Sequence, residues 1–155
     1  MRCALIVLLL TFIACSPQGS VSSTDEPCRT TLCCTTCKVI NVGKTIDGDT
    51  IDSSEGRIRL FGINAPERGE RCYKEAKTKL QELSGQNIRV ESGPRPTDNF
   101  RRRLYYAYTE SGESIDEHLI EQGLAEAWRK DGQHKDYLMS VQQLSQRSKQ
   151  GCLWK

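Results

Sequence analysis

The sequence predicts an α+β fold, a small five-stranded β-barrel of the OB type with three helices packed at its side. Three observations predict it. Five short β-prone runs precede or interrupt the helical patterns, in the order strands, helix, two strands and two helices, which suits such a barrel. The chain of 155 residues is long enough for one core. With 37% apolar and 27% charged residues, it has the composition of a soluble globular domain.

The strands are predicted from alternation and turn signals. They cover residues 38–46, 50–52, 57–63, 87–91 and 104–109, with a loop over residues 93–96 between the last two. Asp47-Gly48 lies between the first two runs, and Asp-Gly at that place is a strong hairpin signal. The third run alternates, so that Ile58 and Leu60 face a core while Arg59 projects from the opposite side.

Three helices follow from periodicity and capping. Residues 73–83 form an amphipathic pattern that Gly85 ends. Ser114 followed by Glu117 three residues later forms a capping box, which predicts a helix start there. The last helix is expected to carry one apolar stripe, made of Tyr137, Val141 and Leu144.

The N-terminal region is typical of an export signal. Residues 1–15 combine a basic start with an apolar run too short for the ~20 residues of a membrane span. Residues 12–15 resemble a bacterial lipobox, so Cys15 is the predicted lipidation site and one lipid chain would tether the protein to a membrane surface. The alternative is a soluble secreted protein cleaved within residues 20–23. Residues 16–34 are predicted to be a flexible, cysteine-containing linker, and residues 35–155 the folded domain.

Charge and motif content narrow the function classes. The net charge of +2 does not by itself indicate nucleic-acid binding, although three successive arginines at residues 101–103 concentrate positive charge. No Ser-His-Asp set, P-loop or dinucleotide fingerprint is present. His118 and His134 fit no metal or nucleophile spacing.

The chain has eight cysteines, many for its size. Loss of Cys3 and lipidation of Cys15 would leave Cys28, Cys33, Cys34, Cys37, Cys72 and Cys152. In an exported chain an even set favours disulfides, although the sequence leaves the pairing open. We expect Cys72 to pair with Cys152 and the N-terminal four to pair among themselves. A zinc site built from the N-terminal cysteines is the alternative.

Four motifs, taken together, resemble the staphylococcal-nuclease family. They are IDGDTI at residues 46–51, RLFGINAPE at 59–67, DNFRRRL at 98–104 and EQGLA at 121–125. Each motif alone is weak, but their order and spacing are specific, and the resemblance extends over residues 38–154. It implies the barrel fold and a calcium-dependent nuclease.

The resemblance also implies a metal site. Asp49 matches one carboxylate ligand of the family, and the backbone carbonyl of Ala65 matches another ligand. The second carboxylate of the family falls at Asn64, which keeps an oxygen but contributes no charge. We therefore expect calcium as the cofactor, bound more weakly or with a different metal preference.

The catalytic set of the family is matched residue for residue by Arg59, Glu67 and Arg102. The two guanidinium groups would bind the phosphate and stabilise developing charge, and Glu67 would orient or deprotonate the attacking water. Substrate contacts are expected from Phe100, Arg101 and Trp128, although Trp128 could equally belong to the core.

The resulting hypothesis is an exported nuclease that hydrolyses DNA and RNA with little sequence preference and leaves 3′-phosphates. No protein partner is predicted. The alternative is a non-catalytic OB-fold module that binds nucleic acid or protein, a reading that Asn64 favours. A third and weaker reading is a redox or zinc protein built on the N-terminal cysteines.

Overall fold

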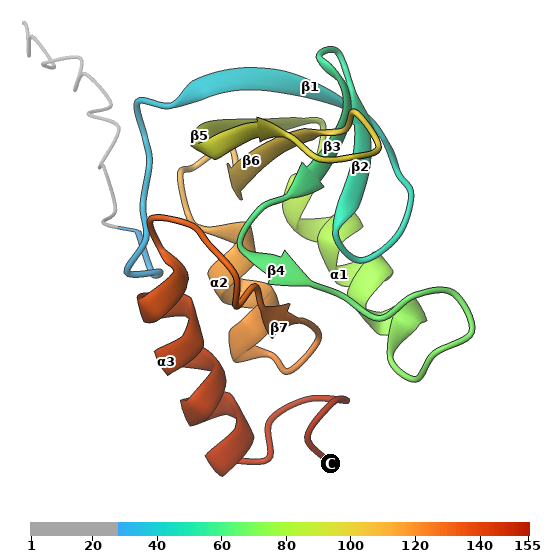
Figure 1. Ribbon diagram of the computed structural model, residues 1–155, viewed down its shortest axis with the longest axis vertical. Helices are drawn as coiled ribbons and strands as arrows, with labels where there is room; N and C mark the ends of the chain where they lie inside the picture. Colours follow the sequence, from blue (N-terminus) through green and yellow to red (C-terminus); the bar gives the residue numbers. More distant parts are fainter. Residues whose placement is uncertain (1–27) are drawn as a thin grey trace, which may run out of the picture.

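The computed structural model describes residues 28–155 (Figure 1). The predicted signal, the lipidation site at Cys15 and the linker up to residue 27 lie outside the described residues, so they stay predictions. Within the described part, no helix is long and apolar enough to cross a membrane.

Five strands close into a barrel, as predicted. They are β1 (Lys38–Thr45), β2 (Thr50–Ser53), β3 (Gly56–Leu60), β5 (Asn87–Thr97) and β6 (Arg103–Tyr108). Their order around the barrel is β1-β2-β3-β6-β5, in which β3 and β6 are parallel and the other neighbours antiparallel. Ile51, Ile58 and Ile88 are fully buried inside it, because alternate side chains of a strand point to one face.

The strand predicted over residues 57–63 breaks at a corner. After β3 the chain turns at Phe61-Gly62 and continues as β4 (Ile63–Asn64), which pairs with β7 (Glu126–Ala127) outside the barrel. Gly62 holds the corner: its N–H donates to the buried Asp116 carboxylate at 3.0 Å, and its carbonyl accepts from the Trp128 N–H at 2.8 Å. Both partners are remote in sequence, so local alternation could not reveal the break.

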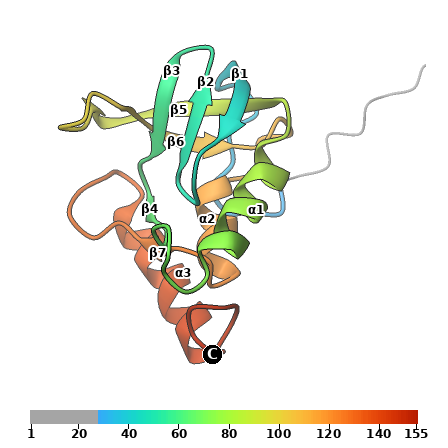
Figure 2. The same ribbon diagram turned by 90° about the vertical axis from the view of Figure 1, so that its right-hand side faces the viewer.

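The loop predicted over residues 93–96 belongs instead to a long β5. Ser92 pairs with Tyr105 and Thr97 pairs with Arg103, so residues 93–96 stand opposite Leu104 alone. This is a large bulge, which accommodates the two prolines of the segment because a bulged residue need not donate to the ladder. The β5–β6 end projects from the barrel (Figure 2, yellow).

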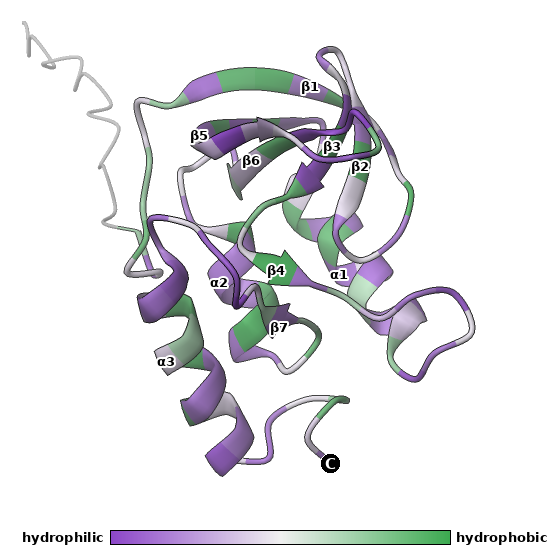
Figure 3. Ribbon diagram, in the orientation of Figure 1, coloured by the Kyte–Doolittle hydropathy of each residue, from purple (hydrophilic) through white to green (hydrophobic). Residues whose placement is uncertain are grey.

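Three helices pack beside and below the barrel, again as predicted (Figures 1 and 2). They are α1 (Tyr73–Ser84), α2 (Ile115–Glu121) and α3 (Lys135–Arg147). Gly85 ends α1 at φ 52°, a left-handed angle that glycine adopts without strain. The stripe predicted for α3 is partly wrong: Val141 is buried, but Leu144 is 64% exposed and Leu138 takes its place in the core. Accordingly, much of α3 is hydrophilic (Figure 3).

The segment 28–34, which the sequence assigns to the linker, packs against α2. Glu117 accepts hydrogen bonds from the N–H groups of Thr31 and Leu32, at 2.9 and 2.8 Å, and from the Tyr137 hydroxyl. Ser114 caps α2 by accepting from the Glu117 N–H, as predicted, but the Glu117 carboxylate is used for the N-terminal segment instead of the reciprocal bond. The folded unit therefore includes residues that composition alone assigned to a linker.

The six cysteines of the described residues form three disulfides. Cys72 pairs with Cys152, as expected, and joins the start of α1 to the C-terminal tail. The N-terminal four pair among themselves, as Cys28–Cys33 and Cys34–Cys37. No thiolate of these six is left for zinc, so the zinc alternative is not supported. Disulfides of this kind are typical of proteins that fold in an oxidising compartment.

Candidate active site

Arg59 projects from β3 at the mouth of the barrel, and its guanidinium is held in place on several sides. Nη1 donates to the carbonyl oxygens of Leu60 and Ile63, at 2.8 and 2.9 Å. Nη2 donates to Oδ1 of Asn64 at 2.9 Å and forms an ion pair with Asp49 at 3.2 Å. The side chain is only 12% exposed. Its orientation is therefore set by the corner between β3 and β4.

Asp49 lies beneath Arg59, directly before β2, and is buried. One carboxylate oxygen accepts from the Ala65 N–H at 3.0 Å and the other from the Thr50 hydroxyl at 3.0 Å. Burial raises the pKa of Asp49, against the opposing effect of Arg59 and the hydrogen bonds. The three residues predicted to hold a metal, Asp49, Asn64 and Ala65, are thus brought together around Arg59.

Arg102 approaches the same mouth from the turn between β5 and β6. Its Nε donates to Oδ2 of Asp98 at 2.7 Å, while the other oxygen of Asp98 accepts from the N–H groups of Phe100 and Arg102. Although burial alone would raise the pKa of Asp98, the bonds from Arg102 outweigh it and hold that pKa below its ordinary value. Asp98 therefore fixes both the turn and the arginine.

Thr50 connects the two arginines. Its hydroxyl accepts from Nη1 of Arg102 at 3.3 Å and donates to Asp49 at 3.0 Å, and Asp49 pairs with Arg59. Because a hydroxyl can donate one hydrogen bond while it accepts another, this side chain joins two cations through one carboxylate. The result is a continuous network from Asp98 to Asn64.

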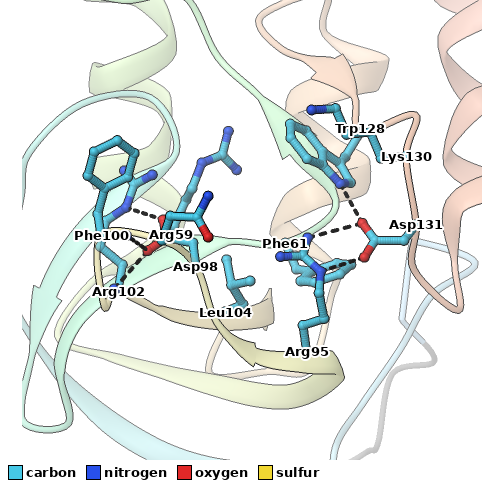
Figure 4. A pocket seen from close by; sticks show the side chains of 11 residues that line it. Arg59, Phe61, Arg95, Asp98, Phe100, Arg102, Leu104, Trp128, Lys130 and Asp131 are labelled. Atoms are coloured by element: carbon cyan, nitrogen blue, oxygen red, sulfur yellow. Dashed lines mark hydrogen bonds and ion pairs between the residues drawn. The ribbon is translucent and has the colours of Figure 1, made fainter.

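Both arginines open into one hollow of about 580 Å³ (Figure 4). On one side Arg102 lies 5.5 Å from the ring centroid of Phe100, whose side chain is 80% exposed. On the other side Trp128 lies 5.4 Å below the Arg59 guanidinium and donates from Nε1 to Asp131 at 2.8 Å. Two aromatic rings and two guanidinium groups are what a stacked base and its phosphate would require.

The far wall of the hollow is closed by an ion pair. Arg95, on the bulge of β5, donates to both oxygens of Asp131, with the shorter contact at 2.5 Å. The Arg95 guanidinium holds the pKa of Asp131 below its ordinary value. Arg95 also lies 5.3 Å from the Phe61 ring centroid, and Lys130 lies 5.3 Å from that of Trp128. This wall joins the β5–β6 end to the loop before α3 (Figure 4).

Glu67 lines a neighbouring hollow, not the one that contains Arg59. Its companions there include Thr50, Phe100, Arg101 and Arg102. Arg102 and Phe100 border both hollows, so they stand between the Arg59 side and the Glu67 side. Glu67 is exposed and its carboxylate has no hydrogen-bond partner among the described residues, which leaves it accessible to water.

The donor set around Asp49 fits a hard cation in type. It offers carboxylate, amide and carbonyl oxygens, the ligands that calcium prefers. The charge is low, however, because Asp49 is the only acidic residue of the three. Within residues 28–155 no three His, Cys, Asp or Glu side chains gather as a metal cluster. Asn64 contributes no charge, and Arg59 already neutralises Asp49. These oxygens fit a divalent ion in chemical type but supply little negative charge for it.

Several residues of this arrangement escaped sequence reasoning. Thr50 and Asp98 lie inside the recognised motifs but had no assigned role. Their positions, directly after Asp49 and four residues before Arg102, were the signals that could have indicated one. No local pattern indicated a role for Arg95, Lys130 or Asp131. Arg95 and Asp131 bind each other across 36 residues, which local pattern cannot reveal.

A family model described as staphylococcal nuclease homologue matches residues 57–155, which include Arg59, Glu67 and Arg102. The match begins at β3 and so excludes β1, β2 and Asp49. No curated protein matches the chain.

Proposed function

The chain belongs to the staphylococcal nuclease homologues, and from this premise we propose that it is an exported, calcium-dependent nuclease. It hydrolyses phosphodiester bonds of DNA and RNA with little sequence preference and leaves 3′-phosphates. The observation that carries this proposal is the network in which Thr50 and Asp49 join Arg102 to Arg59 at one opening of the barrel.

Binding of the scissile phosphate falls to the two guanidinium groups. Arg59 is fixed by two backbone carbonyls, Asn64 and Asp49, which leaves its Nε–H free for the phosphate. Arg102 is fixed by Asp98 and Thr50 and keeps its Nη2 donors free. Both remain protonated: Arg102 can donate paired hydrogen bonds to phosphate oxygens, and Arg59 can donate one from Nε or a second by releasing Asp49. Charge on those oxygens grows in the transition state, so fixed donors stabilise it more than the ground state.

Glu67 is the proposed general base. Its exposed carboxylate borders the hollow of Arg102, where it can accept a proton from a water that attacks phosphorus. The bond between phosphorus and the 5′-oxygen then breaks. Arg102 stabilises the departing oxygen, which takes a proton from water, and the phosphate stays on the 3′-oxygen. Phe100 and Trp128 would stack bases on either side of the phosphate.

A calcium ion would be held by Asp49, Asn64 and the Ala65 carbonyl. When bound, it would supply positive charge to the phosphate and lower the pKa of a bound water. The low charge of this donor set supports weak binding, so activity should require calcium well above the level that a two-carboxylate site needs.

Export and a lipid anchor at Cys15 complete the proposal. Three disulfides support an oxidising compartment, and the signal-like start supports passage across a membrane.

The second candidate is a module that binds nucleic acid without cleaving it. Asn64 and the pairing of Arg59 with Asp49 favour it, since a resident cation already occupies the carboxylate. This module would bind DNA in every metal condition and hydrolyse it in none.

The test is a calcium titration of the purified protein on end-labelled single-stranded DNA. Hydrolysis that rises with calcium, stops with a chelator and falls at least about 10²-fold in Glu67→Gln supports the nuclease. Glu75→Gln, an exposed acid on α1, makes the same chemical change away from the site and should keep full activity. Full activity of Glu67→Gln would remove the assigned base.

A further inference from the structure

The outer face of β6 carries a pair of side chains that the proposed mechanism does not use. Successive residues of a strand point to opposite sides. Leu104 is buried and borders the hollow of Arg59 and Arg102, whereas Arg103 and Tyr105 border a separate hollow of about 460 Å³. The strand therefore separates two recesses, one on each face.

The bulge in β5 opens this second recess. Because residues 93–96 stand opposite Leu104 alone, they bow away from β6 between the pairs Ser92–Tyr105 and Thr97–Arg103. The hollow lies in that gap and is lined by small and polar residues of β5 together with Arg101, Arg103 and Tyr105. Its lining residues belong to β5, β6 and the turn between them, at the end of these strands that projects from the barrel (Figure 2).

The charge of the recess is positive. Two guanidinium groups line it and none of its lining residues is acidic. Arg101 takes part in no ion pair among residues 28–155. Arg103 donates to the Tyr105 hydroxyl at 3.3 Å, and its one ion pair there is with Glu55 at 3.4 Å, an acid already bonded to Lys38 at 2.7 Å. Both cations are exposed, so a polyanion can bind them without displacing a strong partner.

The recess is continuous with the catalytic region through Arg101. Arg101 borders both the second recess and the hollow that contains Glu67 and Arg102. Its backbone has φ 60°, a left-handed angle that is uncommon for a residue with a side chain. The turn distributes three successive arginines: Arg102 points to Asp98 and Thr50, while Arg103 points to Tyr105 and Glu55.

We propose that this recess is a second nucleotide subsite, which binds the single strand on the side of the scissile phosphate reached through Arg101. The Arg101 and Arg103 guanidinium groups bind the next phosphodiester, and the ring of Tyr105 stacks its base. The proposal rests on the proposed function, since it extends the path of the same polynucleotide. It makes the protein prefer substrates longer than the nucleotides that contact Arg59, Arg102 and Glu67.

Equilibrium binding tests it without any need for catalysis. Binding is measured by fluorescence anisotropy in the presence of a chelator, with a labelled 12-nucleotide oligothymidylate and an abasic strand of equal length. Comparison of the two strands distinguishes the phosphate contact from the base contact. Arg103→Gln should lower the slope of log Kd against log salt by about 0.7 on both strands. Tyr105→Leu should weaken the oligothymidylate about tenfold and the abasic strand far less. Arg147→Gln, an exposed arginine at the end of α3, is the matched control and should leave the slope unchanged.

An unchanged slope for Arg103→Gln, with thermal unfolding like that of the wild type, would overturn the subsite. Equal losses for Arg103→Gln and Arg147→Gln would also overturn it, because they would show only a general effect of charge. The two proposals fail separately. A strand that binds through Arg103 but is not hydrolysed in calcium contradicts the nuclease alone, and hydrolysis with binding indifferent to Arg103 contradicts the subsite alone.

Discussion

The corner between β3 and β4 and the turn between β5 and β6 each present one of the two arginines, and they do so in different ways. At the corner, Arg59 is 12% exposed and bonded to two carbonyls, an amide and a buried carboxylate. At the turn, Arg102 is 24% exposed and its neighbour Phe100 is 80% exposed. One region fixes a position within the core, and the other offers contacts that can adapt to substrate.

The difference in burial between the two regions predicts different effects of substitution on folding stability and on substrate binding. Changes at the corner should cost folding free energy because they leave buried polar groups without partners. Changes at the turn should cost less folding free energy, because Arg102 is twice as exposed as Arg59 and Phe100 faces solvent.

The largest effect is expected for Asp49→Ala. It leaves the Arg59 guanidinium without its carboxylate in a nearly enclosed position, which should lower the free energy of unfolding by about 3–5 kcal/mol. Asp98→Ala removes the equivalent partner of Arg102 at the turn and should cost about 1 kcal/mol, since water can replace it. Urea unfolding of both variants checks the contrast, and equal losses would contradict it.

The next effect concerns pH and the carboxylate that holds the corner from below. Burial raises the pKa of Asp116 to about 7, against the hydrogen bonds that Ala107 and Gly62 donate. The folded protein then retains a proton that the unfolded chain has lost. The contribution of Asp116 to stability is therefore complete below its unfolded pKa of 3.8 and is lost as pH rises toward 7, by at most about 1.4 kcal/mol per unit.

Asp116→Asn is the matched control, because an amide cannot titrate. The difference in unfolding free energy between wild type and variant should shrink as the pH rises from 4 to 7. A difference that stays constant over this range would show that Asp116 is ionised throughout.

The smallest effect on folding is expected for Phe100→Ala. An exposed ring contributes little to the core, so the free energy of unfolding should change by no more than about 0.5 kcal/mol. Affinity for single-stranded DNA should fall about tenfold, through the lost stacking and the lost contact with Arg102. Phe100→Tyr restores a ring and should restore binding; if it does not, Phe100 has no stacking role.

The features that could be predicted from the sequence differ from those that could not in how far apart the contacting residues lie along the chain. The barrel and the three helices follow from local pattern. The expected Cys72–Cys152 pair is present, although the sequence left the pairing open. The family resemblance singled out Asp49 and Asn64, which both contact Arg59. What escaped depends on contacts between distant segments. The strand β3 ends before Gly62, whose N–H donates to Asp116, a residue 54 positions later. Thr50 accepts from Arg102, which lies 52 positions later.

The N-terminal boundary of the folded domain also differs from the prediction. The segment 28–34 was grouped with the linker, yet Glu117 binds its backbone across 86 residues, and two disulfides begin in it. Its order depends on contacts with α2, which the residues of the segment alone do not indicate.

The central claim is that Arg59 and Arg102 act on one phosphate. A double-mutant cycle in kcat/KM for DNA hydrolysis, with Arg59→Lys, Arg102→Lys and the double variant, tests it most directly. Lysine keeps each charge but loses the paired donors. If both groups bind one phosphate, the loss in the double variant should fall short of the product of the single losses by about tenfold or more. Losses that simply multiply would show that the two arginines act at separate places.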